Sequence, residues 1–211
     1  MLHEPAHPYV AILGGAKVSD KLGVIRSLAR VADRILIGGA MAFTFLKGKG
    51  VSVGSSKVEE DRVAEMAAYA DELGEKLLLP SDVVVAAKME TGAKTRVVPA
   101  GEIPAGEMGL DIGPASVKEF QKALAGARMV VWNGPMGVFE IREFASGTEG
   151  VARAVAGLAG ATTVVGGGDS VAALNRLQLE SKITHVSTGG GASLEFLEGQ
   201  DLPGIRVLKD A

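Results

Sequence analysis

Short apolar segments alternate with amphipathic stretches along most of this chain. Six apolar segments have the length and composition of β-strands. They span residues 9–13, 34–37, 76–79, 129–132, 162–165 and 183–186. The stretches between them carry apolar residues at helical spacing, as Leu22, Ile25 and Leu28 illustrate. The pattern predicts helices over residues 19–31, 41–46, 58–73, 115–124, 148–158, 171–177 and 193–197.

Strands that alternate with helices favour a parallel sheet covered on both faces. We therefore predict an α/β fold of three layers, built around a six-stranded, mostly parallel sheet. Residues 82–114 depart from this pattern. Apolar segments at 83–87 and 95–98 flank a polar turn at 90–92, which indicates a small antiparallel element. No internal repeat or flexible linker divides the sequence, so we expect residues 1–211 to form a single domain.

Composition narrows the functional classes. Apolar residues make up 47% of the chain, which is enough for a sizeable core. The net charge of −3 argues against a generally basic surface, so we expect no nucleic-acid partner. The sequence contains no cysteine, which excludes disulfides, thiolate metal sites and a cysteine nucleophile. No apolar run approaches the roughly 20 residues of a membrane helix, and we expect a cytoplasmic protein with no membrane partner.

Glycine is the most informative residue type. Five of the six predicted strands lead directly into a glycine-containing turn, and these turns span residues 14–17, 38–40, 133–137, 166–170 and 188–191. In an open α/β sheet the carboxyl ends of the strands face one edge, where ligands bind. Glycine lets the backbone approach a ligand, and the first N–H groups of the following helix bind anions. Together the turns indicate an anion-binding edge, although each one alone is also explained as a tight turn. None matches the phosphate-binding loop G-x-x-x-x-G-K-[ST] or the fingerprint G-x-G-x-x-G.

Several charged residues lie at these turns. Lys17 and Lys21 are four residues apart at the start of a predicted helix, so they lie on one face. Cations there oppose the helix dipole, and a bound polyphosphate would reverse that effect; the alternative is two solvated lysines beside Asp20. Asp169 follows three glycines and precedes a helix. It is either a helix N-cap or a Mg²⁺ ligand, and in the second case Ser170 and the neighbouring amides would hold phosphate.

Five segments of the sequence resemble phosphoglycerate kinase. They are AILGGAKVSDK at 11–21, IGGAMAFTF at 37–45, VWNGPMGVFE at 131–140, GGGDS at 166–170 and HVSTGGGAS at 185–193. The segments follow the family's order, and the likeness spans residues 9 to about 204. Each segment is several residues long, so the resemblance is specific.

The resemblance implies the C-terminal domain of a glycolytic kinase, with a Rossmann-like fold that binds Mg-ADP or Mg-ATP. The whole enzyme exchanges a phosphoryl group between 1,3-bisphosphoglycerate and ADP. By resemblance, Asp169 ligates Mg²⁺, Glu140 meets the ribose hydroxyls and Asn133 lies by the phosphates. The implied catalytic residues are Lys17, Lys21, Gly168 and Gly190. The implied nucleotide-binding residues are Gly15, Ala16, Lys17, Lys21, Gly38, Gly39, Leu110, Asn133, Pro135, Val138, Glu140, Gly167, Gly168, Asp169 and Ser170. Those that would enclose the adenine are Gly15, Ala16, Gly38, Gly39, Leu110 and Val138.

The resemblance covers only part of that family's architecture. The N-terminal domain that binds 3-phosphoglycerate in the family has no counterpart in this sequence. We therefore expect a monomeric fragment that binds ADP or ATP without significant turnover. One alternative is a stand-alone nucleotide-binding regulatory module. Another is an NAD-dependent dehydrogenase, for which Asp33 lies near the expected distance from Gly14 although the fingerprint itself is absent.

Overall fold

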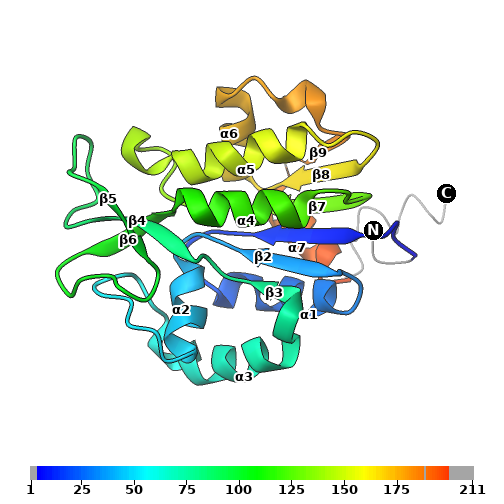
Figure 1. Ribbon diagram of the computed structural model, residues 1–211. Helices are drawn as coiled ribbons and strands as arrows, with labels where there is room; N and C mark the ends of the chain where they lie inside the picture. The colour runs from blue at the N-terminus through cyan, green and yellow to red at the C-terminus, as the bar shows by residue number, and fades with distance from the viewer. Residues whose placement is uncertain (1–3, 188, 200–211) are drawn as a thin grey trace.

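A computed structural model describes residues 4–187 and 189–199 of the chain. Its main element is a six-stranded sheet in which all paired strands run parallel (Figure 1). Across the sheet, the strands are β3 (Leu77–Leu78), β2 (Arg34–Ile37), β1 (Tyr9–Leu13), β7 (Met129–Asn133), β8 (Thr162–Gly166) and β9 (His185–Ser187). The direction of strand order reverses between β1 and β7. The predicted six-stranded parallel sheet is confirmed.

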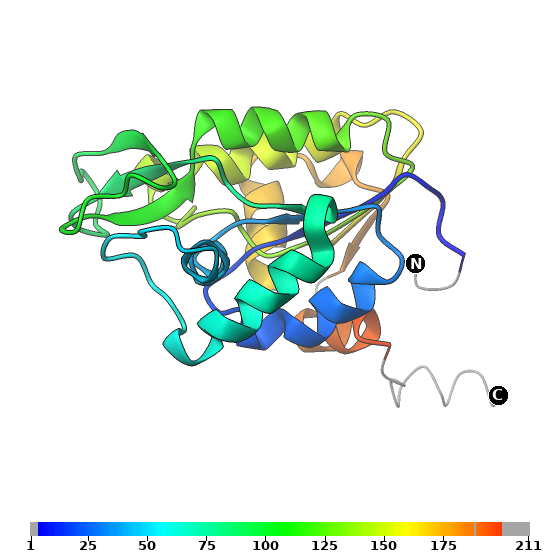
Figure 2. The same ribbon diagram turned by 60° about the horizontal axis from the view of Figure 1, so that its bottom comes forward.

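Helices cover both faces of the main sheet (Figures 1 and 2). One face carries α1 (Leu22–Ala29), α2 (Met41–Gly48), α3 (Val63–Leu73) and α7 (Gly190–Leu197), and the other carries α4 (Pro114–Leu124), α5 (Ser146–Ala156) and α6 (Gly168–Arg176). In β1, Tyr9, Ala11 and Leu13 pack on the first layer, whereas Val10 and Ile12 pack on the second. A strand buried on both faces needs an unbroken apolar run, which is the pattern that the sequence shows. Among the described helices, none is both long and apolar enough to cross a membrane.

A second, antiparallel sheet lies beyond the carboxyl ends of the main strands (Figures 1 and 2). Its order is β5 (Arg96–Pro99), β4 (Asp82–Ala86) and β6 (Met108–Ile112). The sequence predicts the first two strands but not β6. Gly109 and Asp111 interrupt the apolar pattern of β6, although both are buried. Gly109 is required because a Cβ there would lie 2.1 Å from the ring of Phe43.

Several predicted helices differ from the structure at their first turn, and three of them show the local reason. The helix predicted over 58–73 begins at Val63, after a 3-10 turn at Glu60–Arg62, because the side chain of Glu59 is bonded to a distant segment. The helix predicted over 19–31 opens as a 3-10 turn at Ser19–Lys21 and continues as α1. The helix predicted from residue 171 begins at Gly168, because the φ of +92° at Gly167 turns the chain directly from β8 into α6.

Candidate functional site

The turns that follow β1 and β7 are bonded to each other through their backbones. Gly14 N–H donates to the Asn133 carbonyl at 2.9 Å, and Gly15 N–H donates to the Pro135 carbonyl at 3.1 Å. A Cβ at Gly14 would lie 2.0 Å from the Pro135 oxygen, and one at Gly134 would lie 2.2 Å from the Gly14 oxygen. Glycine is therefore required at both positions because two backbones meet there. The tight-packing interpretation of these glycines is correct.

The turn that follows β8 has open space beside it. Gly168 is exposed, and a Cβ there would meet no atom within 4 Å. The first backbone hydrogen bond across this turn runs from Val171 N–H to the Gly167 carbonyl at 3.1 Å. The amides before Val171 form the open first turn of α6, an arrangement in which helices bind anions.

A polar cluster connects this open turn with the start of α1. Lys21 Nζ donates to Asn133 Oδ1 at 2.5 Å. Asn133 is 2% exposed, and its Nδ2 is buried without a hydrogen-bond partner in the described part of the chain. A Cβ at Gly167 would lie 3.2 Å from that Nδ2, so the unpaired donor lies against the open turn. Burial lowers the pKa of Lys21, while the charges of Asp20 and Asp169 oppose that shift. The cluster thus combines an unpaired donor and a partly desolvated cation, both of which a bound anion would satisfy.

An apolar cavity of about 410 Å³ lies between the carboxyl edge of the main sheet and the small sheet. Eight of the predicted site residues line it: Gly15, Ala16, Gly39, Leu110, Pro135, Val138, Glu140 and Asp169. Gly38 does not, because it lies beneath Met136, whose sulfur would be 2.4 Å from a Cβ at Gly38. The carboxylates of Glu140 and Asp169 are the exposed charges among the predicted residues on this wall. Asp169 also acts electrostatically on Lys21, so the apolar cavity and the polar cluster meet at Asp169.

The two lysines have different environments. Lys21 is half-buried and bonded to Asn133, whereas Lys17 is exposed. Burial opposes a lowered pKa of Glu59, but hydrogen bonds from Ser19 and Val18 lower it, and the charge of Lys17 adds to their effect. The predicted shared helical face is not formed, because Lys17 precedes the 3-10 turn that begins at Ser19, and the spacing did not predict this difference in burial.

Other residues that line the cavity were missed by sequence reasoning. Phe43, Met108 and Lys57 line it from α2, β6 and the segment before Glu59. They belong to no glycine turn, and their spacing carries no signal. Their contribution arises because the small sheet and residues 54–59 fold over the carboxyl edge.

Asp111 is a buried acid on the cavity wall that the sequence pattern did not reveal. It is 3% exposed, and its carboxylate accepts hydrogen bonds from Gly147 N–H at 2.6 Å and Ile112 N–H at 3.0 Å. Burial raises the pKa of Asp111 to about 8, against the effect of these two donors. Cβ atoms at Gly137 and Gly147 would lie 2.2 and 2.3 Å from its Oδ1, so both glycines make room for this side chain.

The Ser170 side chain is fully buried and accepts a hydrogen bond from Gly134 N–H at 2.6 Å, so only the backbone amide of Ser170 is left for the predicted phosphate contact, which stays a prediction. Two other interpretations need correction. Asp169 is not an N-cap, because Gly167 holds that position and Asp169 lies inside the first turn of α6. Asp33 precedes β2 at the amino edge and accepts hydrogen bonds from Tyr9 N–H (2.6 Å) and the His7 ring (2.7 Å), which removes the dehydrogenase argument.

The fifth glycine turn is described only in part. Thr188 lies outside the described residues. Gly190 begins α7 after β9, and a Cβ at Gly191 would meet no atom within 4 Å. The predicted catalytic role of Gly190 stays a prediction.

An open parallel sheet with helices on both faces and a cavity at its carboxyl edge defines an α/β protein of Rossmann type. The sequence profile of the family described as phosphoglycerate kinase matches residues 1–200. The chain is 61% identical over its full length to phosphoglycerate kinase of Rubrobacter xylanophilus, and 59% identical over 99% of its length to that of Thermus thermophilus. This chain belongs to the phosphoglycerate kinase family.

Solved structures show the same similarity. The structure of phosphoglycerate kinase from Coxiella burnetii superimposes with a TM-score of 0.93 at 41% identity, and the one from Pyrococcus horikoshii with 0.86 at 34%. These matches cover 98% and 99% of this chain but 54% and 53% of the solved chains. The chain likewise covers 53% of the Rubrobacter protein and 54% of the Thermus protein, so it spans about half the length of its relatives.

Proposed function

We propose that this chain binds Mg-ADP and Mg-ATP as the nucleotide-binding half of a phosphoglycerate kinase. The main support is that an apolar cavity adjoins a polar cluster. That cluster contains Asn133 Nδ2, a buried donor without a hydrogen-bond partner among the described residues. A nucleotide has the matching asymmetry, with a flat apolar base at one end and a polyanion at the other. The family membership supports the same assignment.

The apolar part of the cavity accommodates the adenine. Gly15, Ala16, Gly39, Leu110 and Val138 line this part, and Val138 N–H donates to the Leu110 carbonyl at 2.8 Å, which joins these two lining residues directly. Backbone and aliphatic surfaces of this kind bind a flat ring by excluding water from both of its faces. The exposed carboxylate of Glu140 accepts hydrogen bonds from the ribose hydroxyls.

The phosphates extend toward the polar cluster. Lys21 and Lys17 neutralise their charge, Asn133 Nδ2 donates to a phosphate oxygen, and the amides at Gly167 and Gly168 complete the contacts. Asp169 is the carboxylate that would hold Mg²⁺, since this ion on a nucleotide takes one or two carboxylates and fills its other positions with phosphate oxygens and water. When bound, the metal supplies charge neutralisation between the phosphates.

Phosphoryl transfer requires a second substrate that this half does not hold. The reacting atoms must approach to about 3–3.5 Å, and a closing partner must exclude water from them. We infer that the partner is a second domain which binds 3-phosphoglycerate, and that the transfer runs between 1,3-bisphosphoglycerate and ADP. The chain alone then binds nucleotide without significant turnover.

Calorimetric titration with ADP, ATP and NAD, each with and without Mg²⁺, tests the proposed ligand class. We expect ADP and ATP to bind in a Mg²⁺-dependent manner, and NAD not to compete. Binding of NAD alone would contradict the nucleotide assignment.

A coupled assay with 3-phosphoglycerate and Mg-ATP tests the division of labour. We expect no significant turnover by the chain alone, and turnover when the N-terminal half of a relative is added in trans. Full activity of the chain alone would contradict the proposed division. Nucleotide binding without any activity in trans would favour a stand-alone regulatory module instead.

A further inference from the structure

The segment of residues 54–59, which we call the strap, crosses one wall of the cavity. At one end it is anchored to the small sheet, since Ser55 N–H donates to the Glu107 carbonyl at 2.8 Å and Ser56 Oγ accepts from Gly109 N–H at 2.9 Å. At the other end, Glu59 reaches the chain between β1 and α1. The strap therefore connects the wall that carries Leu110 with the segment that carries Lys17 and Lys21.

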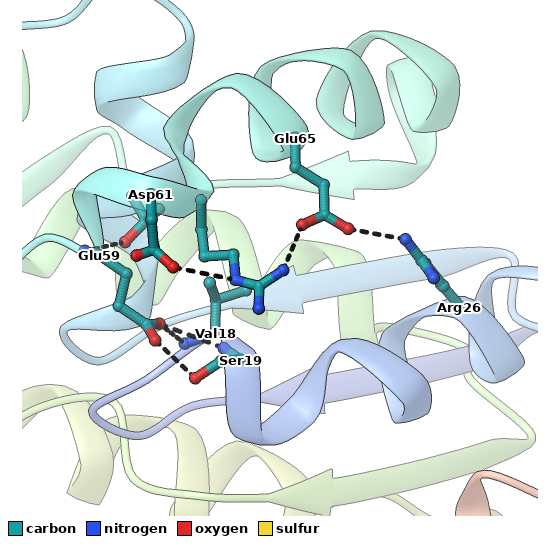
Figure 3. A network of polar contacts seen from close by, with 8 residues as sticks. Val18, Ser19, Arg26, Glu59, Asp61 and Glu65 are labelled. Carbon is teal, nitrogen blue, oxygen red and sulfur yellow. Dashed lines mark hydrogen bonds and ion pairs between the residues drawn. The ribbon is translucent and has the colours of Figure 1, made fainter.

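Glu59 makes three hydrogen bonds to the start of the 3-10 turn Ser19–Lys21 (Figure 3). Its Oε2 accepts from Val18 N–H at 2.5 Å and from Ser19 N–H at 3.2 Å, and its Oε1 accepts from Ser19 Oγ at 2.5 Å. The backbone of Glu59 is held in turn, because its N–H donates to the buried Thr44 Oγ1 at 3.2 Å. Glu59 is therefore held by α2 through its backbone and by the turn before α1 through its carboxylate, so it joins these two segments.

These contacts fall between the two lysines. Val18 is the N-cap of the 3-10 turn, and its side chain has no polar atom with which to cap the turn. Glu59, 41 residues away in sequence, supplies the missing acceptor. A carboxylate is favoured at such an N-terminus by the unpaired N–H groups and by the helix dipole.

We propose that Glu59 is a positioning residue for the phosphate-binding lysines. It holds the backbone from residue 18 to residue 19, so that Lys17 and Lys21 project from a fixed frame on either side. A further consequence is that the amides of Val18 and Ser19 are occupied by a carboxylate of the chain itself. The nucleotide phosphates are then bound by the lysine side chains and by the amides of the open turn at Gly167 and Gly168. This inference rests on the proposed nucleotide function.

The fold has a second brace in the same region, which makes the test practicable. Glu65 in α3 accepts from Arg26 of α1 at 2.7 Å and from Arg62 at 2.9 Å (Figure 3). The last turn of α1 is therefore still attached to α3 when Glu59 is replaced, and we expect the variants to fold.

The experiment compares a ligand that has phosphates with one that lacks them. ADP affinity is measured by calorimetry and adenosine affinity by ligand-observed NMR, for the wild-type chain, Glu59→Ala, Glu59→Gln and Ser19→Ala. Glu60→Gln is the matched control, because the neighbouring carboxylate pairs with the exposed Lys47 at 2.7 Å and not with the 3-10 turn. We expect Glu59→Ala to weaken ADP binding about fivefold, the factor that corresponds to a lost helix cap. Adenosine binding stays unchanged, Glu59→Gln and Ser19→Ala give smaller losses, and Glu60→Gln has no effect.

A double-mutant cycle identifies the route of the effect. If Glu59 acts through the lysines, its replacement costs less ADP affinity in the Lys17→Ala or Lys21→Ala background than in the wild-type chain. Full additivity in both backgrounds would overturn the inference. An equal loss for ADP and adenosine would also overturn it, since that result indicates a general structural role. Tighter ADP binding by Glu59→Ala would overturn it as well and identify Glu59 as a competitor of the phosphates. If the wild-type chain binds neither ligand, the proposed function itself fails, which is a distinguishable result.

Discussion

The turn Gly14–Gly15 after β1 and the turn Gly167–Gly168 after β8 both lie at the carboxyl edge of the main sheet, yet their surroundings differ. Gly14 is enclosed by backbone, and a Cβ there would lie 2.0 Å from the Pro135 oxygen. Gly168 is exposed, and a Cβ there would meet nothing within 4 Å. The same residue type is thus required for packing in one turn and leaves room for a ligand in the other.

This difference divides the edge of the sheet into two parts. The layer formed by the turns after β1, β2 and β7 is a rigid floor held by backbone hydrogen bonds. The open turn and the Lys21–Asn133 pair beside it are the part with unsatisfied groups. Changes in the floor should act on folding, whereas changes in the open part should act on ligand binding.

The largest expected effect is at Gly14. Gly14→Ala forces a methyl group against a backbone carbonyl that cannot move alone, so we expect a loss of more than about 3 kcal/mol in unfolding free energy, or failure to fold. Gly168→Ala is the matched control. We expect it to change stability by less than about 0.5 kcal/mol while it weakens ADP binding. Denaturant unfolding and calorimetry measure the two quantities, and similar stability losses in both variants would contradict the division.

Lys21→Ala should weaken ligand binding, and it should also cost some stability because the buried Asn133 Oδ1 loses this donor. Loss of a charged hydrogen-bond donor to the phosphates should weaken ADP binding by about 1–3 kcal/mol. Lys118→Ala, at an exposed position of α4, serves as the control for removing one positive charge. Equal ADP affinity of the wild-type chain and Lys21→Ala would show that the lysine assignment is wrong.

The buried side chain of Asp111 should make the stability of the fold depend on pH. Its folded pKa of about 8 exceeds the ordinary value of 3.8, so the protonated form is favoured in the folded state and its contribution is fully present below about pH 4. That contribution should be lost as the pH rises toward 8. Asp111→Asn cannot ionise, and its amide provides only one acceptor for two N–H donors, so we expect it to be less stable than the wild-type chain by about 1–2 kcal/mol at pH 4.

The gap between Asp111→Asn and the wild-type chain should narrow or reverse by pH 8. Melting curves at pH 4, 6 and 8 check this expectation. A constant gap across this range would mean that the carboxyl group does not titrate in the folded protein within it.

The smallest expected effect on stability is at Asp169. Because Gly167 holds the N-cap position, Asp169→Asn should change the unfolding free energy by no more than about 0.5 kcal/mol. The Mg²⁺ dependence of ADP affinity should nevertheless fall, since the charged oxygen ligand is lost. A lower melting temperature with unchanged Mg²⁺ dependence would contradict the metal assignment.

The central strands were predictable because a strand buried on both faces has an apolar run, which here ends in a glycine turn. The boundaries of β1 and β2 are those that the sequence predicts. β6 was not predictable, because Gly109 is accommodated against Phe43 and Asp111 accepts a hydrogen bond from the amide of Gly147, and both partners lie elsewhere in the sequence. The start of α3 was missed for the same kind of reason, since Glu59 bonds to Val18 and does not extend the helix.

The sequence by itself determined the type and order of the main elements, the edge at which the glycine turns gather and the family to which the chain belongs. Local patterns carry that information, since strand burial, helical spacing and turn formation are decided within a few residues. Only the tertiary structure decided which glycines have other backbone atoms packed where a Cβ would lie and which have free space there. It also decided which lysine is half-buried and which carboxylate bonds to the turn before α1. Those properties depend on pairs such as Gly14 with Pro135, or Glu59 with Val18, that parallel strand pairing and helix packing bring together across long stretches of chain.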